Sequence, residues 1–182
     1  MTLVAVADTE TTGLKVEKGE RVIEIAIILY ELETEKKIGQ FVKRFNPEFR
    51  IDPKAQLIHK ISQKDLIECE KFKESEPIIT KIFSKSEIAV FHNAAFDCDF
   101  LINEYRLCNV NIPDIEVFDT MAEGRWATSN GKNPTLEELC YACEVEYDRG
   151  KAHAALYDVE KTAECFFFGL KHNGYSISGR IK

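Results

Sequence analysis

The order of apolar and polar positions predicts short strands in the first part of the chain. Leu3 to Ala7 is an unbroken apolar run, which is typical of a strand buried on both faces. The segment 21–30 is rich in Ile and Val and predicts a second strand, and 38–45 predicts a third. Because 31–37 is a polar turn, we expect these strands to form an antiparallel meander.

Proline and capping residues predict an irregular connection followed by two short helices. The dipeptide Asp52-Pro53 indicates irregular chain. Ser62 can cap a helix that begins near Gln63. The dipeptide Glu76-Pro77 predicts the start of a further helix that runs to about Phe83.

The remaining pattern alternates short strands with helices. The expected elements are strands at 88–91 and 117–118 and helices at 94–106, 120–126, 135–143 and 154–171. Thr135 and Glu138 match a capping box, and apolar positions at helical spacing give the last helix one buried face. Strands that come first and then interleave with helices favour a mixed α/β sheet with helices on its faces.

The composition is that of one ordinary globular domain. The chain has 182 residues, of which 45% are hydrophobic and 30% charged. With no linker, repeat or low-complexity tract, we expect a single domain over 1–174 and a loose polar tail over 175–182. The longest apolar runs have six residues, whereas a membrane span needs about 20. Since no basic segment precedes an apolar core at the start, we expect no signal peptide and a cytoplasmic location.

The cysteines and the overall charge exclude some classes of site. One C-x-x-C pair, at Cys140 and Cys143, is too few ligands for a structural zinc site, so we expect six reduced thiols. The net charge of −7 argues against a general nucleic-acid coat. It does not argue against an enzyme that meets nucleic acid through bound cations.

Two segments are candidate contacts for a polynucleotide. Segment 36–64 holds eight Lys or Arg against two acids, which suits phosphate contact; the alternative is the solvated edge of the meander. Arg125-Trp126 lies beside the loop 129–134, where the indole can stack on an unpaired base. The alternative for Trp126 is a core residue at a helix end.

Carboxylates follow two of the predicted strands. Asp8 and Glu10 are two positions apart at the end of the first strand, so an extended chain points both to one side. Asp97 lies in the first turn of the helix that follows strand 88–91, and the ends of neighbouring central strands converge, so it can approach Asp8. The alternatives are a pair of solvated acids at a turn, and an acid favoured by the helix dipole.

A histidine and a fourth carboxylate lie near the start of the last helix. His153 precedes that helix on a loop, and Asp158 lies beside the apolar stripe. Adjacent acids near a core are costly unless a cation joins them, and hard divalent ions take oxygen ligands. Four carboxylates on three elements plus one His are suited to metal-assisted hydrolysis of a phosphodiester, with the His as general base.

Three motifs carry a family resemblance when they are taken together in chain order. Residues 8–14 (DTETTGL), 92–97 (HNAAFD) and His153-x4-Asp158 resemble the DEDDh, or DnaQ-like, 3′→5′ exonuclease family. That family includes the proofreading epsilon subunit of bacterial DNA polymerase III and free-standing relatives. The resemblance implies an RNase H-like fold, with a five-stranded mixed sheet flanked by helices. It also implies two divalent cations, Mg²⁺ or Mn²⁺, and release of nucleoside monophosphates from 3′ ends.

The resemblance assigns roles to residues that match these motifs. Asp8, Glu10 and Asp158 would hold the cation that binds the attacking water, with Asp8 bridging to a second cation. Asp97 would hold that second cation largely through water, and His153 would be the general base. The residues that would grip the terminal nucleotide are Thr11, Leu14, Ile58, His59, Asn93 and Phe96. Leu14 and Phe96 would pack on base faces; the alternative for Leu14, Ile58 and Phe96 is burial in the core.

Three functions remain open from the sequence. The first is a 3′→5′ exonuclease acting on 3′ ends of single-stranded DNA. The second keeps the chemistry on RNA or very short oligonucleotides, because nothing in the site excludes a 2′-hydroxyl. The third is a non-catalytic module associated with a DNA polymerase. The short tail after Gly174 has no apolar docking motif, which favours a free-standing enzyme over a polymerase subunit.

Overall fold

The central strand of the fold is β1 (Leu3–Thr11), which pairs with strands of opposite direction on its two sides. The computed structural model describes residues 1–180. In it β2 (Val22–Glu31) and β3 (Lys36–Arg44) complete the predicted antiparallel meander. On the other side β4 (Ile88–Phe91) and β5 (Glu116–Asp119) run parallel to β1, giving the order β3-β2-β1-β4-β5. The prediction of a five-stranded mixed sheet is confirmed.

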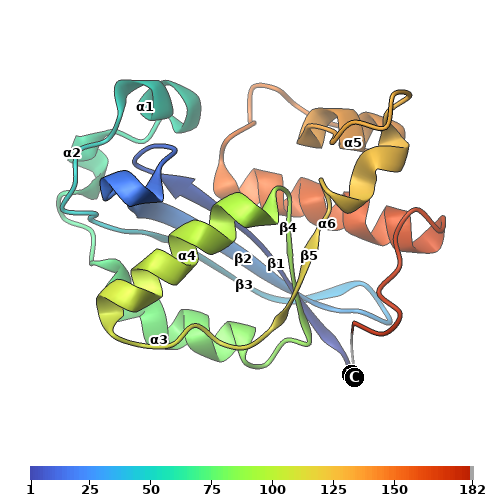
Figure 1. The fold of residues 1–182 in the computed structure, drawn as a ribbon, viewed down its shortest axis with the longest axis horizontal. Helices are drawn as coiled ribbons and strands as arrows, with labels where there is room; N and C mark the ends of the chain where they lie inside the picture. Colours follow the sequence, from blue (N-terminus) through green and yellow to red (C-terminus); the bar gives the residue numbers. More distant parts are fainter. Residues whose placement is uncertain (181–182) are drawn as a thin grey trace.

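Helices cover both faces of this sheet (Figure 1). The helices are α1 (Pro53–His59), α2 (Gln63–Leu66), α3 (Phe72–Phe83), α4 (Ala94–Cys108), α5 (Leu136–Ala142) and α6 (Ala155–Lys171). Helices α3 and α4 cover one face, α5 and α6 cover the other, and α1 and α2 lie beyond one end of the sheet (Figure 1). Side chains alternate along β1, so Ala5 and Ala7 join the core under α3 and α4. Val4 and Val6 join the opposite core under α5 and α6. The carboxylates that continue this alternation at positions 8 and 10 therefore lie on the α6 side.

The irregular connection expected at Asp52-Pro53 is wrong, because helix α1 begins there. The Asp52 carboxylate accepts a hydrogen bond of 2.7 Å from the Lys54 N–H, and Pro53 occupies the first helical position. Proline lacks only an N–H that would have no partner at that position, so it starts the helix instead of excluding it. This helix carries Ile58 and His59, two of the predicted nucleotide-binding residues.

The helix start predicted at Glu76-Pro77 is also wrong. Helix α3 begins at Phe72, and Pro77 lies inside it. Phe72 is buried against the rings of Phe45 and Tyr105, with centroids 5.1 Å and 6.0 Å away. Because this packing stabilises the first turn, tertiary contact outweighs the cost of proline in a helix.

The chain after β5 differs from the predicted helix at 120–126. Only Glu123–Ala127 is helical, as a short 3₁₀ segment. The Asp119 carboxylate accepts hydrogen bonds from the N–H groups of Met121 and Ala122, which turns the chain sharply after the strand. A short, tightly wound segment is the usual consequence of such a turn.

The tail is not loose at its start. Tyr175 is 6% exposed, its ring contacts Phe118 and Trp126, and its hydroxyl donates a hydrogen bond of 2.8 Å to the Thr120 carbonyl. Residues 181 and 182 of the predicted tail lie outside the described residues. The division into a domain over 1–174 and a tail over 175–182 stays a prediction, but Tyr175 belongs to the core.

All six cysteines are free, as predicted. Cys140 and Cys165 are buried between α5 and α6 with their sulfur atoms 3.5 Å apart. Across residues 1–180, no helix combines the length and the apolar character that crossing a membrane requires.

Candidate active site

The first part of the site forms where β1 outlasts its parallel neighbour. Strand β4 pairs with β1 only as far as Val6, so on that side of β1 the Thr9 N–H has no neighbouring strand to bond to. Instead, Asp97 Oδ1 accepts hydrogen bonds from the Thr9 N–H at 2.9 Å and the Thr9 hydroxyl at 2.7 Å. These two bonds fix the first turn of α4 against the end of β1, and Asp8 and Glu10 flank Thr9 on the other side of the strand.

The second part comes from the loop before α6 and its first turn. His153 has a backbone φ of 62°, and its N–H donates a hydrogen bond of 3.0 Å to Asp158 Oδ2. One ligand atom each from Glu10, His153 and Asp158 lies within 4.8 Å of the other two. The fold therefore brings these three residues, which are distant in sequence, together at one place.

Burial and mutual repulsion make this cluster electrostatically costly. Burial, and then the charges of Asp97, Glu10 and Asp158, raise the pKa of Asp8 well above its usual range. Burial and neighbouring carboxylates raise the pKa of Glu10 to about 9. Burial raises the pKa of Asp97 to about 7 even though the bonds from Thr9 oppose it, and burial also raises the pKa of Asp158. Carboxyls this close cannot all ionise without a compensating positive charge.

The residues of the cluster fit divalent cations. The donors are carboxylate oxygens, which suit Mg²⁺ and Mn²⁺, and the His153 imidazole lies beside them. Asp158 Oδ1 is buried and has no hydrogen-bond partner among residues 1–180, so it is an oxygen left for a ligand. A bound cation would satisfy this oxygen and would favour the ionised form of every carboxyl in the cluster.

The predicted nucleotide-binding residues lie in two groups of structural elements. Thr11 and His59 are buried. Burial lowers the pKa of His59, and the backbone carbonyl of Thr11 beside the ring partly offsets this effect. Leu14 and Ile58 are 75% and 47% exposed, so they do not belong to the core. These two apolar side chains are available at the surface for contact with a ligand.

The other two predicted residues lie at the start of α4. The Asn93 N–H donates a hydrogen bond of 3.0 Å to Asp119 Oδ1, with Asn93 in the left-handed region at a φ of 78°. Phe96 is half-buried, and its ring centroid is 4.9 Å from that of Phe100. Phe96 is therefore partly anchored in the core, with the remainder of its side chain open to solvent.

Sequence reasoning missed three residues that shape the site. Thr9 holds Asp97, and Asp119 holds the start of α4 through the Asn93 N–H. Glu24 is 7% exposed, and its charge contributes to the raised pKa of both Asp8 and Glu10. Glu24 is the only acid within the apolar run 22–29, and this lone charge was the signal that could have identified it.

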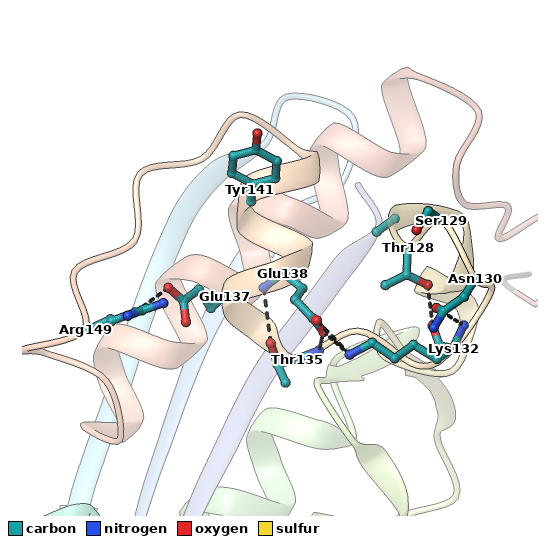
Figure 2. Close-up of a pocket in the computed structure, with 10 residues that line it drawn as sticks. Thr128, Ser129, Asn130, Lys132, Thr135, Glu137, Glu138, Tyr141 and Arg149 are labelled. Atoms are coloured by element: carbon teal, nitrogen blue, oxygen red, sulfur yellow. Dashed lines mark hydrogen bonds and ion pairs between the residues drawn. The ribbon is translucent and has the colours of Figure 1, made fainter.

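A hollow of about 550 Å³ lies elsewhere, between the loop 127–132, helix α5 and Arg149 (Figure 2). It contains none of the predicted site residues. The charged residues that line it form two ion pairs of 2.6 Å, one between Lys132 and Glu138 and one between Arg149 and Glu137. Its charges are thus already paired, and the unsatisfied carboxylates are at the end of β1. Trp126 is 41% exposed nearby, with one side against Tyr175.

Comparisons with known proteins agree with this geometry. A model of the RNase_T family, described as exonuclease, matches residues 5–166. The chain is 31% identical over 170 residues to DNA polymerase III subunit epsilon of Escherichia coli (strain K12), covering 88% of this chain and 68% of that subunit. It is 28% identical over 177 residues to ribonuclease T of Shewanella sp. (strain MR-4), covering 90% of this chain and 79% of that protein.

A solved structure is similar to this fold. The crystal structure of E. coli exonuclease I in complex with a dT13 oligonucleotide aligns with a TM-score of 0.79 at 19% identity. The alignment covers 93% of this chain but only 41% of exonuclease I, so the chain spans about two fifths of that protein's length. The predicted RNase H-like fold is confirmed.

Proposed function

We propose that this chain, which belongs to the RNase_T exonuclease family together with DnaQ-like proteins such as the epsilon subunit and ribonuclease T, is a 3′→5′ exonuclease of single-stranded DNA. The observation that carries the proposal is the meeting of four carboxylates from β1, α4 and α6 beside His153. Such a site hydrolyses a phosphodiester with the help of two divalent cations.

In this proposal each side chain of the cluster has one task. Asp8, Glu10 and Asp158 would hold one cation, and Asp97 together with Asp8 would hold the other. When bound, the cations supply positive charge that stabilises the attacking and leaving oxygens of the phosphate. His153 accepts the proton of the attacking water, because its ring lies beside Glu10 and Asp158 and is exposed to solvent.

The surrounding residues would hold the terminal nucleotide. The exposed side chains of Leu14 and Ile58 and the open part of Phe96 suit contact with base faces, which is tolerant of base sequence. The polar groups of Thr11, His59 and Asn93 suit the sugar and its 3′-hydroxyl. The exonuclease I structure with an oligonucleotide supports single-stranded DNA as the substrate class.

The test is nucleotide release from an oligonucleotide of defined polarity. The purified protein is incubated with single-stranded DNA carrying a 5′ label, with Mg²⁺, with Mn²⁺ and with a chelator. We expect products that shorten one nucleotide at a time from the 3′ end, with nucleoside 5′-monophosphates released only when a cation is present. Shortening from the 5′ end, or internal cuts in a circular single strand, would contradict the proposal.

RNA is the second candidate substrate, favoured by the similarity to ribonuclease T. Competition between DNA and RNA oligonucleotides of the same sequence and length decides between them. A larger kcat/KM on DNA supports the first candidate, and a larger value on RNA, or on dinucleotides alone, replaces it.

Association with a DNA polymerase is a further proposal, drawn from the similarity to polymerase III epsilon subunits, with the cytoplasm as the expected location. It is tested by co-purification with the polymerase catalytic subunit, compared with the activity of the protein alone. Full exonuclease activity without a partner would favour a free-standing enzyme.

A further inference from the structure

A row of three charged residues crosses the sheet next to the carboxylate cluster. Glu10 on β1 lies opposite Glu24 on β2, and Glu24 lies opposite Arg44 on β3. Directly opposed residues of neighbouring strands point to the same face of a sheet. All three therefore lie on the face that α6 covers, where Asp158 meets Glu10.

Arg44 is held in this row through only one edge of its guanidinium. Its Nε atom is 2.5 Å from Glu24 Oε2, and no other hydrogen bond or ion pair from residues 1–180 reaches the Arg44 side chain. The Glu24 side chain is 9% exposed, whereas that of Arg44 is 47% exposed. A buried carboxylate thus orients an arginine whose two terminal nitrogens remain available to a ligand from solvent.

Arg44 lies close to the place where the reacting end of the substrate would bind. Neighbouring strands lie about 4.8 Å apart, so the Cα atom of Arg44 is about 10 Å from that of Glu10. Arg44 is also near the buried ring of His59, where its charge adds to the effect of burial in lowering the His59 pKa. Arg44 therefore lies near both Glu10 and helix α1, which carries His59.

Glu24 and Arg44 contribute opposite charges beside the carboxylate cluster. Glu24 alone would add a fifth negative charge beside Asp8 and Glu10. Pairing with Arg44 offsets that charge and presents a planar cationic group of the kind that binds phosphate oxygens. A single strand that brings its 3′ end to the cluster carries further phosphates on its 5′ side, which need such a partner.

We propose that Arg44, oriented by Glu24, binds a backbone phosphate of the substrate strand on the 5′ side of the phosphate that is cleaved. This inference rests on the proposed exonuclease function and names a substrate-binding residue for it. Arg44 contacts substrate and Glu24 positions Arg44. Contact with a phosphate carries no base information, so the effect is the same for every sequence.

The test compares substrates that have and lack the second phosphate. A dinucleotide without a 5′ phosphate offers only the bond that is cleaved, whereas a trinucleotide adds one phosphate on the 5′ side. For Arg44→Ala we expect KM for the trinucleotide to rise about tenfold and to rise less for the dinucleotide. The slope of log affinity against log salt for a longer oligonucleotide should become less steep by about one.

Two variants separate phosphate binding from indirect effects. Lys43→Ala removes the same charge from the neighbouring position, whose side chain lies 3.2 Å from Glu70; we expect no dependence on substrate length. The double variant Glu24→Gln/Arg44→Ala removes the carboxylate charge that Arg44→Ala leaves without a partner. If the inference is correct, the double variant keeps the raised KM for the trinucleotide.

Two results would overturn the assignment of Arg44. One is a KM that rises equally for both substrates, and the other is a double variant with the KM of the wild type, which would attribute the effect to Glu24 alone. If the wild type releases no nucleotide, the proposed function fails by itself. Fluorescence anisotropy with a 5′-labelled DNA oligonucleotide then tests Arg44 separately, and unchanged affinity of Arg44→Ala would refute it.

Discussion

The hydroxyl of Thr9 donates a hydrogen bond of 2.7 Å to the buried carboxylate of Asp97, across 88 positions of sequence. Together with the Thr9 N–H, it is the main influence that holds the pKa of Asp97 down against burial, leaving that pKa at about 7. Thr9→Val keeps the shape of the side chain but removes this donor. We expect the Asp97 pKa to rise, because hydrogen bonds to the ionised form favour it.

The measurement for Thr9→Val is Mn²⁺ affinity by calorimetry over a range of pH. Since a cation needs the ionised carboxylate, we expect weaker binding near neutral pH and recovery at higher pH. Thr9→Ser keeps the hydroxyl and serves as the matched control. Equal pH profiles for Thr9→Val and the wild type would show that the hydroxyl does not tune Asp97.

The carboxylate cluster predicts how stability depends on pH without metal. The folded-state pKa values of about 7 for Asp97 and about 9 for Glu10 lie above the ordinary values of 3.8 and 4.5. The folded protein thus holds protons that the unfolded chain releases. This contribution to stability is complete below the ordinary values and is lost as the pH rises through the raised ones.

Thermal unfolding in the presence of a chelator checks this prediction. We expect Tm to be lower at about pH 8.5 than at about pH 5, and Mg²⁺ to raise Tm more at the higher pH. The variant Asp8→Asn/Glu10→Gln removes two of the interacting charges and should flatten both dependences. A metal-free Tm that rises across this interval would mean that the four carboxyls do not repel one another as described.

His153 is expected to be essential for rate but not for folding. His153→Asn is the suitable variant, because the backbone φ of 62° is one that asparagine tolerates. Loss of a general base lowers kcat by about 10² to 10⁴-fold, with Mn²⁺ binding largely kept. His172→Ala, at the exposed end of α6, is the control with unchanged rate. A His153→Asn enzyme with wild-type kcat would assign the base to another group.

The cap of helix α1 links stability to nucleotide binding. Asp52→Ala removes the carboxylate that accepts the Lys54 N–H, and we expect a loss of about 1 kcal/mol in the free energy of unfolding. Because α1 carries Ile58 and His59, KM should rise while kcat changes little. Asp52→Ser keeps a capping oxygen and should restore both values. Denaturant unfolding and steady-state kinetics measure them, and a changed kcat with unchanged KM would contradict this link.

The sequence alone determined the five strands and indicated which side chains could form the cluster. Apolar runs and alternation correctly predicted all five strands, and the capping box at Thr135 correctly predicted α5. Asp8 and Asp97 follow neighbouring strands, whose ends lie close together, and the resemblance to DnaQ-like exonucleases added Asp158 to the same expected site. These features depend on periodicity over a few positions, which a chain displays before it folds.

Tertiary structure decided what depends on partners distant in sequence. The burial of Tyr175, the early start of α3 at Phe72 and the exposure of Leu14 follow from which surfaces meet. The row of Glu10, Glu24 and Arg44 depends on strand register, and a bulge between Glu10 and Thr11 shifts that register just beyond it. Register is set by the packing of whole strands, since a slip of one position would move every side chain to the opposite face.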